Sequence, residues 1–273
     1  MKTTFSVAEL KTALRCMKQF DYRWLQGLKI APTFTQASSQ GVRAGVRRAY
    51  EMVGKAEPEE IEEEAATAAE VKVAEVFASG DIRDPHGMSE DQLLCEKSRT
   101  ERRTDKATRL FVEHTLPYLP SDLTPDQGWA LNVPGLAEFS GEFSAIDIGY
   151  TPIATRIFYP IPDDDAELLR DPLLALDAYA AETIRQEETK EAGEIKANNC
   201  IILATVSSKT TNSAHITFSD DSIERALDRI ESVVEAVNKG CFMPAPHDSW
   251  TCNNEYCGFY GMCPYGQRNR TQR

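Results

Sequence analysis

Three cysteines stand close together near the end of the chain, in the pattern Cys252-x4-Cys257-x5-Cys263. Glycines and other loop-forming residues separate them, so the backbone can wrap around a common centre. Thiolates bind zinc and iron–sulfur clusters, and both kinds of centre usually take four of them. The spacing therefore predicts a metal centre here, with a fourth thiolate from elsewhere in the chain.

The composition is that of an ordinary globular protein, with 41% hydrophobic and 27% charged residues in a chain of 273. No apolar run approaches the roughly 18 residues of a membrane span. The first residues, Met1 to Phe5, lack the basic-then-apolar layout of a secretory signal. We expect a cytoplasmic protein without a membrane partner. In such a reducing compartment, a chain with seven cysteines is expected to use thiols to bind metal rather than to form a disulfide framework.

Charge is distributed unevenly along the chain. Residues 1–48 carry nine Lys or Arg against two acids, and residues 264–273 add three Arg. Since the whole chain has a net charge of −13, the middle must carry −23. Such a division favours a basic end that meets phosphates and an acidic body that faces solvent or a protein partner.

Caps and apolar periodicity predict a mixed α/β chain. The capping box Ser6-Val-Ala-Glu9 opens a helix with Cys16 near its middle, and a polar loop over 32–40 precedes a basic helix over 41–53. Helices over 57–78 and 89–115 form an acidic insertion. The remaining predictions are strands over 129–133, 139–148, 153–161, 200–206 and 215–218, with helices over 171–189 and 219–239.

The segment Leu10 to Gly27, LKTALRCMKQFDYRWLQG, resembles the first motif of the RecB-type PD-(D/E)XK iron–sulfur nucleases. This family includes CRISPR-associated exonucleases, AddB and many phage proteins. One N-terminal and three C-terminal cysteines hold its 4Fe-4S cluster and clasp the two ends of the domain. The resemblance assigns Cys16, Cys252, Cys257 and Cys263 to that cluster, with zinc as the alternative. Many members have two residues, rather than four, between the first two C-terminal cysteines.

The same resemblance implies one α/β domain with a restriction-endonuclease-like core, a central mixed sheet flanked by helices. Residues 1–53 would form the N-terminal helices with the first cysteine, and 54–128 the acidic helical insertion, which the resemblance does not cover. Residues 129–240 would form the sheet core and 241–273 the cluster-binding coil. Cys95, Cys200 and Cys241 have no place in the motif and are expected to be ordinary buried thiols.

The family's catalytic positions are degenerate in this chain. Carboxylates there hold Mg²⁺ or Mn²⁺, and a lysine orients the attacking water. The motif histidine falls on Gly45, the first aspartate on Ser144, and the Asp-x-Lys pair on Phe158 and Pro160. The Gln-x-x-x-Tyr motif keeps only Tyr179. We therefore expect no catalytic residues, and Glu142 and Asp147 are the nearest carboxylates that could substitute.

The resulting hypothesis is a catalytically degenerate nuclease-fold protein that binds DNA or a partner in DNA repair, recombination or a CRISPR-type complex. One alternative is an active Mg- or Mn-dependent exonuclease with relocated carboxylates, and another is an acidic protein that mimics DNA. The basic residues expected to contact phosphates are Lys11, Arg15, Lys18, Arg23, Arg43, Arg47, Arg48, Arg268 and Arg270.

Overall fold

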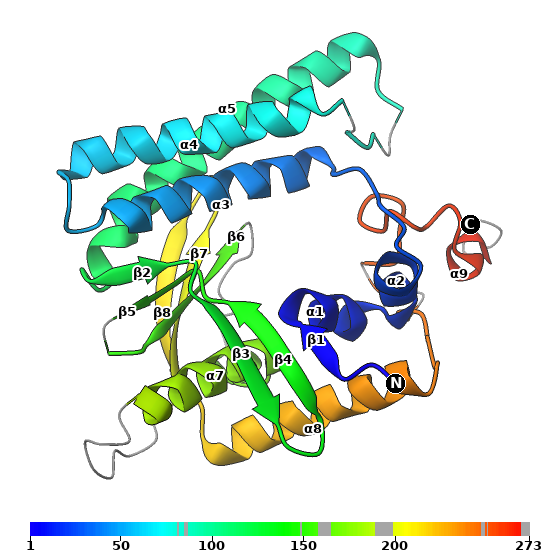
Figure 1. Ribbon diagram of the computed structural model, residues 1–273. Helices are drawn as coiled ribbons and strands as arrows, with labels where there is room; N and C mark the ends of the chain where they lie inside the picture. The colour runs from blue at the N-terminus through cyan, green and yellow to red at the C-terminus, as the bar shows by residue number, and fades with distance from the viewer. Residues whose placement is uncertain are drawn as a thin grey trace.

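Two β-sheets with helices on both sides make up the computed structural model of the protein (Figure 1). The structure describes residues 1–80, 82–84, 87–147, 149–157, 165–188, 199–246, 249 and 251–268. This arrangement is compatible with the expected mixed sheet flanked by helices. No described helix combines the length and the apolar character needed to cross a membrane.

The N-terminal helix is interrupted at Cys16, so the prediction of one continuous helix was wrong. Strand β1 (Thr4–Ser6) leads into α1 (Val7–Arg15), which begins with the expected capping box at Ser6 and Glu9. Cys16 is extended, with φ −165° and ψ 110°. The chain then resumes as α2 (Met17–Phe20) and a π-helical turn η1 (Asp21–Leu25).

Three long helices form one layer: α3 (Phe34–Met52), α4 (Pro58–Ala78) and α5 (Glu90–His114), followed by the short η2 (Leu116–Tyr118). Helix α3 starts earlier than predicted because Thr33 and Gln36 form a capping box. In it, Gln36 Oε1 accepts a hydrogen bond of 2.9 Å from Thr33 N. Residues 34–40 are thus helical rather than a loop.

Glycines let α3 approach its neighbours closely. A Cβ on Gly41 would lie 2.4 Å from Val73 Cγ2, and one on Gly45 would lie 2.7 Å from the Ala65 carbonyl oxygen and 2.6 Å from Thr108 Cγ2. Both glycines therefore face α4 and α5. Helix α3 and the acidic insertion form one packed unit rather than a core with a loose appendage.

The larger sheet has five strands in the order β2-β5-β6-β7-β8. Only β6 and β7 are parallel neighbours, and the other pairs are antiparallel. The strands are β2 (Leu123–Pro125), β5 (Ala145–Asp147), β6 (Pro152–Ile157), β7 (Cys200–Val206) and β8 (Thr211–Thr217). Strand β8 begins four residues before the predicted strand, and the predicted strand over 139–148 divides into β4 and β5.

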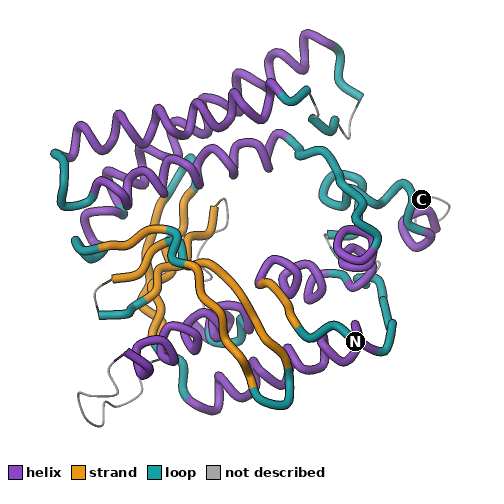
Figure 2. The backbone as a smooth tube through the Cα atoms, viewed as in Figure 1, coloured by secondary structure: helices purple, strands orange, loops and turns teal. Residues whose placement is uncertain are grey.

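A smaller sheet, in the order β1-β4-β3, joins β3 (Gly128–Val133) and β4 (Ala137–Glu142) to the N-terminus. Helices α6 (Asp165–Leu168) and α7 (Pro172–Glu188) lie between β6 and β7 in the chain, α8 (Asp220–Asn238) follows β8, and α9 (Pro264–Arg268) ends the described chain. Figure 2 shows α7 and α8 on the side of the sheets opposite the three-helix layer.

Side chains of β7 point alternately to the two faces of the sheet, so this strand contributes to the hydrophobic core on each face. Ile202, Ala204 and Val206 pack with α3 and α5 residues, whereas Ile201 and Leu203 pack with α7 and α8 residues. This confirms the prediction of a buried strand at 200–206. Burial of both faces of β7 holds the two helical layers at a defined distance from the sheet.

The close approach at Gly45 predicts that Gly45→Ala destabilises the protein. Alanine favours a helix interior by up to about 1 kcal/mol, but overpacking costs about 1–3 kcal/mol, so we expect a net loss. Thermal unfolding measures this, with Gly261→Ala as the control because a Cβ there meets nothing within 4 Å. A Gly45→Ala variant as stable as the wild type would contradict the packing argument.

Candidate functional site

Four cysteines from the two ends of the chain line one cavity. They are Cys16 at the α1–α2 break and Cys252, Cys257 and Cys263 of the C-terminal coil. The cavity encloses about 330 Å³ of space without atoms, part of it open to solvent. The tertiary fold thus brings together the four thiols that the sequence motif singles out.

Hydrogen bonds and aromatic packing fix the walls of this cysteine cavity. The Ala245 N–H donates to Cys16 Sγ over 3.3 Å, so the extended Cys16 meets the C-terminal coil directly. The Tyr22 ring packs against Phe259 with centroids 5.3 Å apart, beside Cys257 and Cys263. Burial raises the pKa of the Cys257 thiol, and the neighbouring cysteines add to that shift.

In the parts of the chain that the structure describes, no three His, Cys, Asp or Glu side chains are arranged to hold a metal ion together. By its chemistry alone, a set of four thiols is the ligand set of a zinc site or of an iron–sulfur cluster. The other three cysteines lie elsewhere, and the expectation that they are buried was wrong for Cys95 and Cys241, which are exposed.

A second pocket lies between α3 and β6, where the degenerate catalytic motif would stand. Ser144 Oγ accepts a hydrogen bond of 3.0 Å from Thr155 N, so the β6 residues beside Ser144 are Thr155 and Ile157. Tyr50 reaches the same place from α3, with its hydroxyl 3.1 Å from Thr155 Oγ1. Tyr50 and Thr155 thus place hydroxyls, and Ile157 an apolar side chain, on the α3 and β6 side of Ser144.

The structure changes one of the motif assignments. Gly45 faces α4 and α5, so it does not stand in the α3–β6 pocket, and the α3 residues that line it are Arg43, Val46, Arg47 and Tyr50. Phe158 and Pro160 lie outside the described residues. Sequence reasoning missed Thr155, although its position two residues before Ile157 matches the alternation of a strand.

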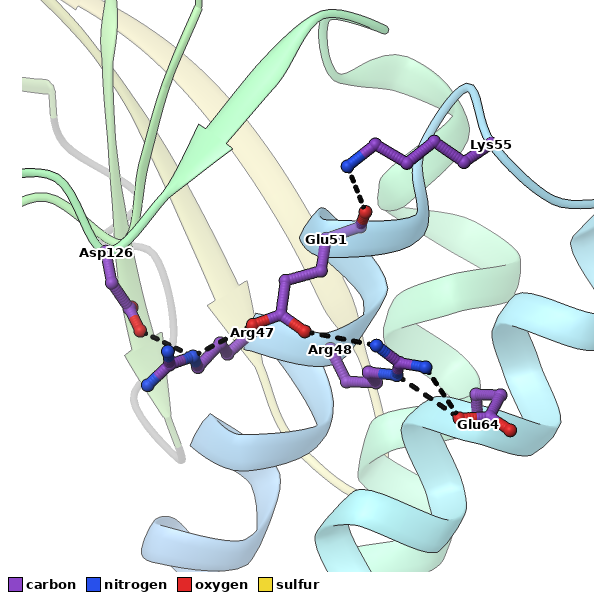
Figure 3. A network of polar contacts seen from close by, with 6 residues as sticks. All are labelled: Arg47, Arg48, Glu51, Lys55, Glu64 and Asp126. Carbon is purple, nitrogen blue, oxygen red and sulfur yellow. Dashed lines mark hydrogen bonds and ion pairs between the residues drawn. The ribbon is translucent and has the colours of Figure 1, made fainter.

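Two carboxyl groups meet at the rim of the pocket, Glu142 from the end of β4 and Asp126 from the loop before β3. Burial raises the pKa of Glu142, and the charge of Asp126 and a hydrogen bond between the two groups raise it further. Arg47 Nε lies 2.7 Å from Asp126 Oδ2 and 3.1 Å from Glu51 Oε1 (Figure 3). Sequence reasoning had named Glu142 but not Asp126.

Asp147, the other fallback carboxylate, belongs to a turn. Its Oδ1 accepts a hydrogen bond of 2.7 Å from Thr151 N, and its main chain pairs with Thr151 and Tyr150. It does not line the α3–β6 pocket. The tertiary structure therefore replaces Asp147 by Asp126 as the partner of Glu142.

The predicted basic residues divide into two groups. Arg47 and Arg48 form ion pairs with α3, α4 and loop acids, including Arg48 Nη2 to Glu64 Oε2 at 2.9 Å (Figure 3), and Lys18 pairs with Asp21. Lys11, by contrast, is exposed and lies near Arg15, Arg43 and Arg156. Surrounding protein and these cations lower the pKa of Lys11, although Asp171 opposes the shift. Arg15, Arg43 and Arg156 thus lie near Lys11 in a basic surface to which α1, α3 and β6 contribute.

Arg23, Arg268 and Arg270 were also predicted to contact phosphates. The Arg23 guanidinium lies over the Trp24 ring, 5.2 Å from its centroid. Arg268 ends α9 without a described side chain, and Arg270 lies outside the described residues. Arg156, which sequence reasoning did not name, joins the basic surface and also pairs with Asp171.

A buried carboxyl group lies behind this basic surface. Asp177 Oδ1 and Trp129 Nε1 are both shielded from solvent, and among the described residues neither has a hydrogen bond of good geometry. Trp129 is nevertheless close enough to act on the Asp177 carboxyl group. Burial raises the pKa of Asp177 to about 7, although Trp129, Arg156 and Lys11 oppose the shift. Ionisation of Asp177 is thus coupled to the charges of Lys11 and Arg156.

No family model and no curated protein matches the chain. Among solved structures, the chain is similar to the Eubacterium rectale protein named "Putative exonuclease", with 12% identity, a TM-score of 0.48, and coverage of 90% of this chain and 86% of that one. It is also similar to SSO0001, with 14% identity, a TM-score of 0.40 and coverage of 97% and 88%. At this level neither likeness identifies a family.

The pKa of Asp177 predicts a pH-dependent stability. The folded protein keeps the Asp177 proton up to about pH 7, whereas the unfolded chain releases it near 3.8, so the folded state binds more protons between these values. Stability should fall as pH rises from 4 to 7, and Asp177→Asn should remove this part of the fall. Urea unfolding at pH 5 and pH 8 measures it, with Asp228→Asn as the exposed control. Identical pH profiles of Asp177→Asn and wild type would contradict the assignment.

Proposed function

We propose that the protein is a nuclease-fold iron–sulfur protein that binds DNA without the catalytic residues of the family it resembles. The observation that carries this proposal is the meeting of Cys16 with Cys252, Cys257 and Cys263 at one cavity. Residues more than two hundred positions apart in the chain share this cavity, and all four are those of the family motif. Chance burial of thiols does not account for that coincidence.

The family resemblance favours a cluster over a single zinc ion. In that family one N-terminal and three C-terminal cysteines hold a 4Fe-4S cluster, and the four matching cysteines line one cavity here. Each iron of such a cluster would take one thiolate. When bound, the cluster would crosslink the two ends of the chain. The Ala245 N–H would stabilise the Cys16 thiolate.

Loss of catalysis is supported by the chemistry around Ser144. Tyr50, Thr155 and Ile157 offer hydroxyls and an apolar side chain beside Ser144, and no lysine lines the pocket among the described residues. The carboxyl groups of this pocket, Asp126 and Glu142, do not occupy the Asp and Asp-x-Lys positions of the family motif. Tyr50 cannot act as a general base near neutral pH because complete burial raises its pKa. Binding without cutting is therefore the function that these residues favour.

DNA binding is supported by the convergence of cations from separate elements. Lys11 and Arg15 on α1 and Arg43 on α3 share the basic surface with Arg156 of β6. Because these like charges oppose each other in the free protein, an anionic ligand that neutralises them is favoured. A phosphate backbone supplies such charges in a row.

A cofactor measurement tests the first part of the proposal. Protein purified without air should contain iron and acid-labile sulfide, and Cys16→Ser should lose both and unfold at lower temperature. Removal of a crosslink across so long a loop costs roughly 4–5 kcal/mol in the chain-entropy estimate. Cys95→Ser is the control, because Cys95 is exposed and far from the motif. Stoichiometric zinc without sulfide would refute the cluster.

Salt-dependent binding tests the second part. If Lys11, Arg15 and Arg43 each contact a phosphate, the logarithm of the binding constant should fall against log salt with a slope of about −2 for a single strand or −3 for duplex. The double variant Lys11→Ala, Arg43→Ala should bind weakly and with a flatter slope. Arg48→Ala is the matched control, since Arg48 is already paired with Glu51 and Glu64. Equal loss in both variants would argue against this surface.

The pair Asp126–Glu142 favours a second candidate function, a metal-dependent nuclease with relocated carboxylates. Two hydrogen-bonded carboxyl groups beside Ser144 could hold Mg²⁺ or Mn²⁺ once both are ionised. Incubation of the DNA complex with either metal separates the two functions. Cleavage by the wild type that Glu142→Gln abolishes would establish the nuclease and overturn the binding-only proposal.

A further inference from the structure

Arg83 joins the helical insertion to the cysteine coil. It lies in the loop between α4 and α5, at the end of the three-helix layer nearest the C-terminal coil (Figure 1). Its Nη1 donates to the Asn254 carbonyl oxygen and its Nη2 to the Glu255 carbonyl oxygen, each over 3.0 Å. Its own N–H donates to the Pro32 carbonyl oxygen over 2.9 Å. Arg83 thus joins its own loop to two other segments that are distant in sequence, the one at Pro32 and the one at Asn254 and Glu255.

The two acceptor carbonyls are the middle pair of the four residues that separate Cys252 from Cys257. The chain turns tightly here, because Asn253 Oδ1 accepts from Glu255 N at 2.9 Å and from Tyr256 N at 3.0 Å. The turn presents both carbonyl oxygens side by side to one guanidinium. A planar guanidinium suits this two-point contact, and the positive charge strengthens each hydrogen bond.

Arg83 also lies close to the thiols. Its guanidinium is near enough to Cys257 for an attractive electrostatic interaction with that residue. Its Nε is shielded from solvent and has no hydrogen-bond partner in the described part of the chain. Arg83 as a whole is half-buried, and an unsatisfied shielded donor is costly, so the contacts that it makes through Nη1 and Nη2 offset that cost.

We propose that Arg83 is a positioning residue that holds the Cys252–Cys257 turn against the cysteine cavity, so that the helical insertion keeps the cavity closed. The longer spacing between these two cysteines provides the carbonyls that Arg83 grips. The insertion therefore has a structural role at the metal centre, although its sequence lies outside the nuclease resemblance. The effect of Arg83 on the cluster rests on the proposed function, but its hydrogen bonds to the Cys252–Cys257 turn do not.

Alkylation of the metal-free protein by iodoacetamide, read residue by residue with mass spectrometry, tests the grip directly. Arg83→Ala should raise the labelling rates of Cys252 and Cys257 by about tenfold or more, as expected when charged hydrogen bonds are lost. Arg83→Lys should give an intermediate rate, because an ammonium cannot serve both carbonyls as a planar fork does. The exposed Cys95 should be labelled equally in all variants.

Arg99→Ala is the matched control, since Arg99 belongs to the same insertion and pairs with Glu96 of its own helix. Equal labelling of Cys252 and Cys257 in wild type, Arg83→Ala and Arg83→Lys would overturn the proposal. Should Arg83→Ala not fold, Arg83→Lys decides by the same measurement. In iron-loaded protein, Arg83→Ala should also lose iron to a chelator faster than Arg99→Ala. A wild type without iron and sulfide would refute the cluster, while the alkylation result would still decide the role of Arg83.

Discussion

Helix α3 packs against α4 and α5 on one side and against the sheet core on another, and the positions of these elements depend on that packing. Gly41 and Gly45 permit contact with α4 and α5 at a separation that a single Cβ would prevent. Val46 and Tyr50 pack into the core above the sheet, and Arg43 faces the pocket beside Ser144. One helix therefore connects the acidic insertion, the sheet core and the candidate site. A shift of α3 would disturb all three.

The close contact of α3 with α4 and α5 gives Gly45 a packing role, apart from its match to the histidine position of the family motif. A side chain at Gly45 would collide with Ala65 and Thr108, so glycine is required there for packing. The residues that do reach the pocket from α3 come from the next face of the helix, Arg43, Arg47 and Tyr50. Close packing of the insertion against α3 thus depends on the glycine at this position.

The two ends of the chain are joined by contacts of a different kind. Cys16 leaves the helical conformation, and its sulfur accepts a hydrogen bond from Ala245, while Arg83 reaches the same coil from the insertion. The C-terminal coil has few regular hydrogen bonds of its own beyond its turns. Its arrangement therefore depends on these long-range contacts and, in our proposal, on the bound cluster.

Local signals in the sequence determined much of this protein. The family resemblance linked Cys16 to Cys252, Cys257 and Cys263, and the fold places all four at one cavity. The capping box at Ser6 and the buried strand at 200–206 were predictable, because each depends on residue type and short spacing. The helix break at Cys16 and the neighbours of Ser144 were not. They depend on which distant segment meets the residue. Only the tertiary structure paired Asp126 with Glu142, turned Gly45 toward α4 and placed Arg83 on the cysteine coil, since these contacts join segments that no local pattern relates.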